Sequence, residues 1–255
     1  PYDTFRDWYT KDYQSFVDYN IVDVELVDRL EDKMKLLELL FTMAYEAKVN
    51  YEDVFGQVKY WDVLIHNYLK NKKVVIPQKP HSSKSDKYEG AYVKDPQVGQ
   101  HKWVMSFDLN SLYPHLIMQY NISPETLIDG HNIKTDVNSL LSGTTNTEEA
   151  VQMNATLCPS GVMFNKDSKG FLPKLMQKMY DDRTKYKKQM LKIKQEKENG
   201  EGDPVLQTKQ ISALNNKQMA AKILLNSCYG ALGNQYFRYF DIRQAESITL
   251  SGQLS

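Results

Sequence analysis

The chain has 255 residues, of which 41% are hydrophobic and 25% charged, as in an ordinary globular protein. This length allows one large domain or two small ones. The sequence has no charge-free apolar run of about 18 residues, so we expect no membrane span, and it shows no signal peptide. Cys158 and Cys228 are too far apart for a zinc motif, and two cysteines make no disulfide framework, which fits a reducing compartment.

The formal net charge is zero, which argues against a simple basic DNA-binding module. The charges are distributed unevenly along the chain. Residues 1–60 carry 13 Asp and Glu against 7 Lys and Arg, whereas residues 174–222 carry 6 against 12. A basic run usually forms a solvated, salt-bridged helix face. The alternative is that this segment faces phosphate groups.

The first half of the chain predicts helices followed by a strand. Apolar residues at helical spacing indicate helix over most of 12–48, and a second helical stretch covers 51–70. Residues 77–87 are rich in Pro, Ser and Lys and predict a linker or loop. The apolar run Trp103–Phe107, with its aromatic and β-branched residues, predicts a buried strand. A turn into a helix follows it, up to Tyr120.

The second half predicts a helical hairpin. Residues 129–161 are polar and indicate loops around a short helix. A basic helix over 174–198 and a second helix over about 207–229 are separated by the breaker Asn199–Pro204. Two helices joined by a short breaker indicate an antiparallel hairpin. The last 20 residues restart as strand-like or helical chain.

Asp108 follows the predicted strand, where a carboxylate points out of the core and a ligand can reach it. The alternative is that Asp108 caps the following helix. It opens the string Asp108-Leu109-Asn110-Ser111-Leu112-Tyr113-Pro114. A carboxylate is a suitable ligand for Mg²⁺, and backbone N–H groups exposed by the turn can hold phosphate oxygens.

Two pairs of polar residues share helix faces on the predicted hairpin. Lys222 and Asn226 are four residues apart, as are Arg183 and Lys187, so each pair lies on one face. The guanidinium offers a planar fork for phosphate and the ammonium groups offer point charges. The alternative is an ordinary exposed basic face with local salt bridges to neighbouring aspartates.

These strings resemble motifs of the family B DNA polymerases. The Asp108–Pro114 string resembles motif A (D-x-x-S-L-Y-P), and Lys222–Gly230 resembles motif B (K-x3-N-S-x-Y-G). Arg183 with Lys187 resembles the R-x3-K pattern of the first fingers helix. Four shorter strings agree, namely Tyr88–Ala91, Asn121–Thr126, Gly170–Pro173 and the exonuclease-like Y-x3-D of Tyr19 and Asp23. The likeness is strongest to replicative polymerases of T-even-like bacteriophages.

The resemblance implies a helix-rich α+β fold, with a partial palm sheet and fingers formed by an antiparallel helical hairpin. Residues 1–40 would be the C-terminal end of a 3′–5′ exonuclease domain. A helical linker region at 41–87 would lead into the first part of the palm, 88–169. The fingers would span 170–234, and 235–255 would begin the return to the palm.

The resemblance also implies roles for single residues. Asp108 would be the catalytic carboxylate and bind metal together with Leu109, and Tyr113 would exclude a 2′-hydroxyl. The residues expected to bind dNTP are Leu109, Ser111, Leu112, Tyr113, Arg183, Lys187, Lys222 and Asn226. Those expected to contact DNA are Tyr88, Gly90, Tyr229 and Gly230, whereas Tyr19 and Asp23 would be an exonuclease remnant. The cofactors would be two Mg²⁺ ions, with Mn²⁺ as a substitute.

The implied function is template-directed addition of dNTP to a primer 3′-hydroxyl. No acidic pair of the motif C type follows Gly230, and the first two exonuclease motifs would precede Pro1. We therefore expect an incomplete polymerase with little activity alone. Its partners would be primer–template DNA, dNTP and a sliding clamp contacted by a missing C-terminal part. Its location would be the cytoplasm, that of an infected host cell if the protein is viral.

One other class of function remains open, and three further classes are disfavoured. A non-catalytic DNA-binding module could retain polymerase-like segments, and dNTP binding distinguishes it from a polymerase. A nuclease that relies on Asp23 alone is disfavoured, because Asp23 is a single carboxylate without partner carboxylates. A P-loop ATPase is disfavoured because the G-x4-G-K-[ST] string is absent, and an RNA polymerase is disfavoured by Tyr113.

Overall fold

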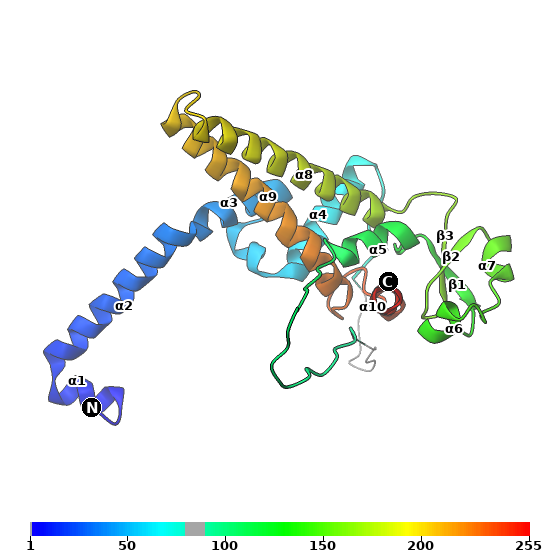
Figure 1. Ribbon diagram of the computed structural model, residues 1–255, viewed down its shortest axis with the longest axis horizontal. Helices are drawn as coiled ribbons and strands as arrows, with labels where there is room; N and C mark the ends of the chain where they lie inside the picture. The colour runs from blue at the N-terminus through cyan, green and yellow to red at the C-terminus, as the bar shows by residue number, and fades with distance from the viewer. Residues whose placement is uncertain (1, 80–89) are drawn as a thin grey trace.

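The computed structural model describes residues 2–79 and 90–255. Helices dominate it, and one small sheet lies at the side of the molecule opposite the N-terminus (Figure 1). This agrees with the expected helix-rich α+β class. Most of the predicted linker 77–87, and Tyr88 after it, lie outside the described residues. Within the described part of the chain, no helix is both long and apolar enough to cross a membrane.

The first two helices project away from the rest of the chain (Figure 1). Helix α1 spans Phe5–Lys11 and α2 spans Tyr13–Met34, and Asp12 caps α2 by accepting a hydrogen bond from the Ser15 N–H. Neither helix has a buried residue. The predicted helix over 12–48 is therefore confirmed, with a break at Lys35, but the apolar side chains of α2 face solvent in this structure.

Helix α3 (Leu36–Ala47), the 3-10 helix η1 (Tyr51–Phe55) and α4 (Gln57–Asn71) form a support beneath the hairpin. The indole of Trp61 in α4 is fully buried, and its Nε1 donates to Ser227 Oγ at 3.0 Å. The buried indole removes a large apolar area from water, and its N–H group keeps a hydrogen-bond partner. Trp61 thereby joins the N-terminal helices to the second hairpin helix.

The predicted antiparallel hairpin is present. Helices α8 (Phe171–Glu198) and α9 (Pro204–Leu232) lie side by side along their length (Figure 1). Asp203 caps α9 by accepting from the N–H groups of Val205 and Leu206, and Pro204 occupies the first helical position, where its missing N–H costs nothing. Cys228 of α9 and Cys158 are both buried free thiols, and burial raises the pKa of Cys158 to about 12.

The polar region 129–161 contains more regular structure than predicted. Strands β1 (Leu127–Asn132), β2 (Ala155–Leu157) and β3 (Val162–Asn165) form an antiparallel sheet in the order β1-β3-β2. Two short helices, α6 (Val137–Leu141) and α7 (Glu148–Gln152), lie between β1 and β2. The prediction of loops around a single short helix was wrong, because strands of three to six residues are too short for a clear alternating pattern.

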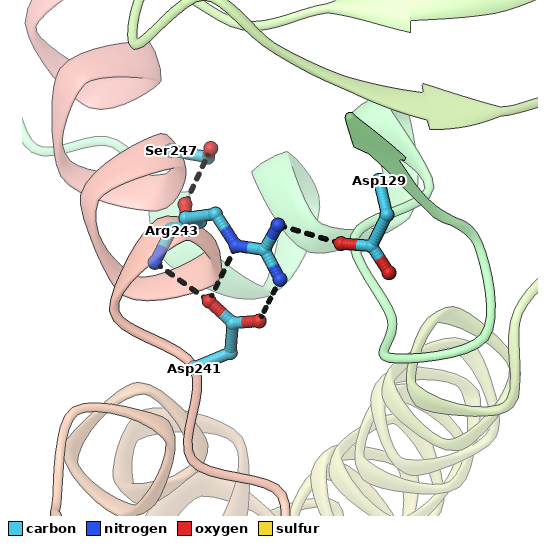
Figure 2. Close-up of polar contacts among 4 residues, drawn as sticks. All are labelled: Asp129, Asp241, Arg243 and Ser247. Carbon is cyan, nitrogen blue, oxygen red and sulfur yellow. Dashed lines mark hydrogen bonds and ion pairs between the residues drawn. The ribbon is translucent and has the colours of Figure 1, made fainter. Parts of the chain in front are cut away.

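The last helix, α10 (Ile242–Leu254), settles the ambiguous C-terminal segment as helical and packs against α5 (Leu112–Tyr120). An ion-pair network at its start links it to the sheet (Figure 2). The Arg243 guanidinium donates to Asp241 Oδ2 at 2.6 Å and to Asp129 Oδ1 of β1 at 2.7 Å. The Ser247 hydroxyl donates to the Arg243 carbonyl at 2.6 Å.

The predicted buried strand Trp103–Phe107 is wrong. The segment has no regular secondary structure, and the side chains of Trp103 and Phe107 are 97% and 86% exposed. A strand is stabilised by a neighbouring backbone, and the described sheet consists of β1, β2 and β3 without this segment. The apolar composition is genuine, but it has no partner among the described residues.

Asn121 connects three parts of the fold. Its Nδ2 donates to the carbonyls of Asn165 at 2.6 Å and Ser168 at 2.9 Å, and its Oδ1 accepts from the Gly170 N–H at 2.9 Å. Asn121 also ends α5 in the left-handed conformation, with φ 59°. The side chain therefore fixes the end of α5 against the end of β3 and the start of α8.

We predict that Asn121→Gly lowers the free energy of unfolding by about 2–4 kcal/mol, because three hydrogen bonds at a buried site are lost while glycine suits the positive φ. Urea unfolding followed by circular dichroism measures the change. Asn154→Gly is the matched control, since Asn154 is exposed, has φ 47° and makes one side-chain hydrogen bond to Asp167. Equal losses in the two variants would contradict the prediction.

Candidate nucleotide-binding site

The turn from Asp108 to Ser111 leads into α5, which begins at Leu112. Ser111 adopts the left-handed conformation with φ 56°, which is uncommon for a residue other than glycine. Pro114 lies in the first turn of α5, where no helical N–H is needed. This geometry places the backbone of residues 108–111 ahead of a helix N-terminus, a region that favours negative charge.

A cavity of about 340 Å³ lies where this turn meets the hairpin. Arg183 of α8 lines it, as do Lys222 and Asn226 of α9, and the turn supplies Asp108, Leu109, Asn110, Ser111, Leu112, Tyr113 and Pro114. Residues that are more than 100 positions apart in the sequence thus share one cavity, as the spacing of polar residues on the hairpin suggested. Their chemical roles stay predictions.

The hairpin side of the cavity is positively charged. Arg183 Nη1 lies 3.4 Å from Ser111 Oγ, a long contact, and Arg183 Nε is buried without a hydrogen-bond partner in the described structure. Lys222 and Asn226 are exposed and follow each other by one turn of α9. A guanidinium with an unsatisfied N–H beside a second cation favours an anionic ligand with several oxygen acceptors.

Lys187 differs from the other predicted phosphate ligands. It lies one helical turn beyond Arg183 on α8, is exposed and does not line the cavity. The structure therefore does not bring Lys187 together with the residues that line the cavity. The nearby Asp181 accepts a hydrogen bond from Gln177 rather than from Arg183.

Tyr113 forms the cavity wall on the α5 side and contacts Tyr229 of α9, with ring centroids 4.7 Å apart and planes inclined by 52°. Gly252 of α10 lies behind Tyr113, and a Cβ at position 252 would stand 3.3 Å from Tyr113 Cε1. Gly230 of α9 faces Gln57, whose Oε1 would be 2.7 Å from an added Cβ. Gly252 could not be predicted from local sequence patterns, because its contact with Tyr113 joins distant segments.

The other predicted residues lie elsewhere. Tyr19 and Asp23 lie on α2, a helix that projects away from the rest of the chain (Figure 1), and neither lines the cavity. Tyr19 packs its ring against Phe5 and Trp8. Gly90 accepts a hydrogen bond through its carbonyl from Gln253 Nε2 of α10 at 3.1 Å. Tyr88 lies outside the described residues.

Asp108 is the one carboxylate among the described residues that line the cavity. Within residues 2–79 and 90–255, no group of three or more His, Cys, Asp and Glu side chains is arranged to hold a metal ion. Mg²⁺ commonly uses one or two protein carboxylates and completes its shell with phosphate oxygens and water. Asp108 therefore fits a metal that binds together with a phosphorylated ligand.

A second cavity, of about 380 Å³, lies behind the hairpin, between α3 and α4 on one side and α8 and α9 on the other. Partial burial is the main cause that raises the pKa of Glu46 in its wall, and Asp182 raises it further, whereas Lys217 and Lys178 oppose the shift. Asp182 and Arg183 are neighbours in sequence but line different cavities. The hairpin therefore separates two cavities, of which only one contains the predicted residues.

Comparison with known proteins decides the family of this chain. Residues 55–254 match the model described as DNA polymerase family B. The chain belongs to this family. Among its relatives are the DNA-directed DNA polymerases of Escherichia phage RB69 and Enterobacteria phage T4, each 33% identical over 95% of this chain. The chain spans 31% of the length of each of these phage polymerases.

Archaeal members of family B are similar as well. DNA polymerase 1 of Pyrococcus abyssi is 32% identical over 78% of this chain and 22% of its own length. The solved structure of the family B DNA polymerase from Pyrobaculum calidifontis superposes with a TM-score of 0.63, covering 87% of this chain and 26% of that chain at 23% identity. This likeness shows that the fold is shared.

We predict that Tyr113 and Tyr229, the aromatic residues of the two family B motifs, are energetically coupled by about 0.5–1.5 kcal/mol, the usual range for a contacting aromatic pair. Tyr113→Leu, Tyr229→Leu and the double variant form a double-mutant cycle, read out by urea unfolding. The control cycle pairs Tyr113→Leu with Tyr9→Leu, since Tyr9 lies on the remote α1. Strict additivity of Tyr113→Leu and Tyr229→Leu would refute the contact.

Proposed function

We propose that this chain is the nucleotide-binding part of a DNA-directed DNA polymerase that adds dNTP to a primer 3′-hydroxyl. The single observation that carries the proposal is the cavity that joins the Asp108–Pro114 turn to Arg183, Lys222 and Asn226. The names of the phage and archaeal relatives support the same reaction. In this assignment the hairpin, residues 170–234, is the fingers, and residues 88–169 with 235–255 belong to the palm.

The triphosphate would bind between the turn and the hairpin. Arg183 and Lys222 supply two positive charges at the cavity, and Lys187 adds a third farther out on α8. Asn226 offers a neutral amide beside Lys222. The backbone N–H groups of Ser111 and Leu112 lie at the N-terminus of α5, where the helix dipole favours the same anion.

The sugar would lie against Tyr113. Its ring is held from behind by α10, because Gly252 leaves space for Tyr113 and little more, and from the side by Tyr229. A ring held on two sides cannot move aside easily to admit an additional hydroxyl. Tyr113 is therefore proposed to select deoxyribonucleotides, and Tyr229 and Gly230 to lie near the nascent base pair.

Asp108, with the Leu109 carbonyl, would hold Mg²⁺, or Mn²⁺ in its place, and the ion would supply charge stabilisation for the attacking and leaving oxygens. Complete catalysis by two metal ions needs at least one more carboxylate than the described cavity contains. We propose that the 255-residue chain binds dNTP but extends primers poorly. Efficient primer extension by the purified chain would disprove this part of the proposal.

The remaining assignments follow from the family resemblance. Primer–template DNA is the proposed macromolecular partner, contacted through Tyr88, Gly90, Tyr229 and Gly230. A sliding clamp is a further proposed partner. Residues 1–40 are proposed as the end of an exonuclease domain, with Tyr19 and Asp23 as its remnant, and 41–87 as a helical linker. An infected host cell is the proposed location.

The second candidate function is a DNA-binding module without chemistry, and the basic surface of α8 favours it. Most Lys side chains of this helix are exposed, including Lys185, Lys187 and Lys188. Such a module binds DNA through phosphates, with affinity that falls as salt rises. It has no need for a cavity that combines a carboxylate with an arginine and a lysine, so dNTP binding distinguishes the two functions.

We predict that Lys222→Ala weakens binding of dATP in the presence of Mg²⁺ by about 10-fold or more, since a hydrogen bond to a charged group contributes about 1.5–3 kcal/mol. Isothermal titration calorimetry measures the dissociation constant. Lys209→Ala is the matched control, because Lys209 is an exposed lysine of the same helix that lines neither cavity. If both variants bind like the wild type, the triphosphate does not bind at this cavity.

A further inference from the structure

His115 does not line the cavity, yet it contacts both of the walls that form it. Its Nδ1 lies 2.9 Å from the carbonyl oxygen of Ser111, and its backbone N–H donates to the same oxygen at 3.1 Å. On the other side, its ring meets the ring of Tyr180 in α8 edge to face, with centroids 4.8 Å apart and planes inclined by 81°.

The first contact acts on the turn. A carbonyl oxygen only accepts hydrogen bonds, so Nδ1 of His115 carries the proton and donates. The Ser111 carbonyl oxygen thus accepts two hydrogen bonds from His115, one from the backbone N–H and one from Nδ1. Ser111 itself has the left-handed conformation, which costs a non-glycine residue about 1–2 kcal/mol. The side chain of His115 therefore stabilises the turn that lines the cavity.

The second contact acts on the fingers helix. Tyr180 precedes Arg183 by three positions on α8, so both residues lie on the face of α8 that packs against α5. The ring of His115 against Tyr180 sets how closely this face approaches the turn. This approach in turn sets the distance between Arg183 and the turn, where Arg183 Nη1 lies 3.4 Å from Ser111 Oγ.

Support for the turn from its other side is weak. The segment before Asp108 is irregular and exposed, and it is not paired with the described sheet. The position of residues 108–111 therefore depends on contacts made by α5, and His115 provides a contact there that reaches both the backbone of the turn and the hairpin.

We propose that His115 is a positioning residue that couples the turn at Ser111 to helix α8 and thereby sets the affinity for the nucleotide triphosphate without touching it. The inference rests on the proposed function, since the ligand is the same dNTP. It assigns the effect to two separable contacts, the Nδ1 hydrogen bond and the ring contact with Tyr180.

Four variants separate the two contacts. His115→Asn retains a donor in the place of Nδ1 but loses the ring, whereas His115→Phe retains the ring but loses the donor. We expect each to weaken binding of dATP with Mg²⁺ by about 3-fold and His115→Ala by about 10-fold. Tyr180→Leu should match His115→Asn, and combining these two should add nothing, because each removes the same ring contact.

The controls make the outcome specific. His66→Asn, an exposed histidine of α4, should bind dATP like the wild type. Urea midpoints are measured for every variant. If His115→Asn and His115→Phe each bind dATP more tightly than His115→Ala, the loss of affinity does not come from a general loss of folding. If His115→Ala fails to fold, the Asn and Phe variants with Tyr180→Leu carry the test.

The possible results distinguish this inference from the proposed function. If Lys222→Ala weakens dATP binding but all His115 variants bind like the wild type, the inference is wrong and the proposed function stands. If the wild-type chain does not bind dATP, both are wrong. Additive effects of His115→Asn and Tyr180→Leu would overturn the coupling through the ring contact.

Discussion

The junction held by the Asn121 side chain is the constraint on which the candidate site depends. Three hydrogen bonds fix the end of α5 to the end of β3 and the start of α8. Ser123 and Glu125 add hydrogen bonds to the first N–H groups of α8, so that the helix begins at a capped, negatively charged position. Because α5 starts at the cavity turn and α8 carries Arg183, this junction sets the separation of the two cavity walls.

The hairpin packs against α3 and α4 on one face and lines the candidate nucleotide cavity on another, and the packed face determines where the cavity-lining face points. Trp61 and the apolar residues of α4 pack against α9, and Glu38 of α3 accepts a hydrogen bond from Asn216 of α9 at 3.1 Å. Lys222 and Asn226 lie on the opposite side of the same helix, at the candidate nucleotide cavity. Any rotation of the hairpin that changes the nucleotide cavity must therefore also change the packing on α3 and α4.

Local patterns in the sequence were sufficient to predict the hairpin and the polar pairs at four-residue spacing, because these depend on residues within a few turns of one another. The strand predicted at Trp103–Phe107 failed because strand formation depends on a paired neighbour, which composition does not reveal. The contacts of Tyr113 with Tyr229 and Gly252 were equally inaccessible, since each joins segments more than 100 residues apart.

The irregular backbone of residues 108–110 also limits how tightly the cavity can bind the proposed ligand. Asp108, Leu109 and Asn110 are exposed and belong to no helix or strand, so binding must first restrict their backbone. Fixing one residue costs about 1–2 kcal/mol, which for three residues is comparable to the contribution of one or two charge-assisted hydrogen bonds. Arg183 and Lys222 lie on the regular helices α8 and α9, whereas Asp108 lies in an irregular segment. Under the proposed function, phosphate recognition by Arg183 and Lys222 should therefore precede metal recognition by Asp108, and the proposed role of His115 is to order the turn before the ligand binds.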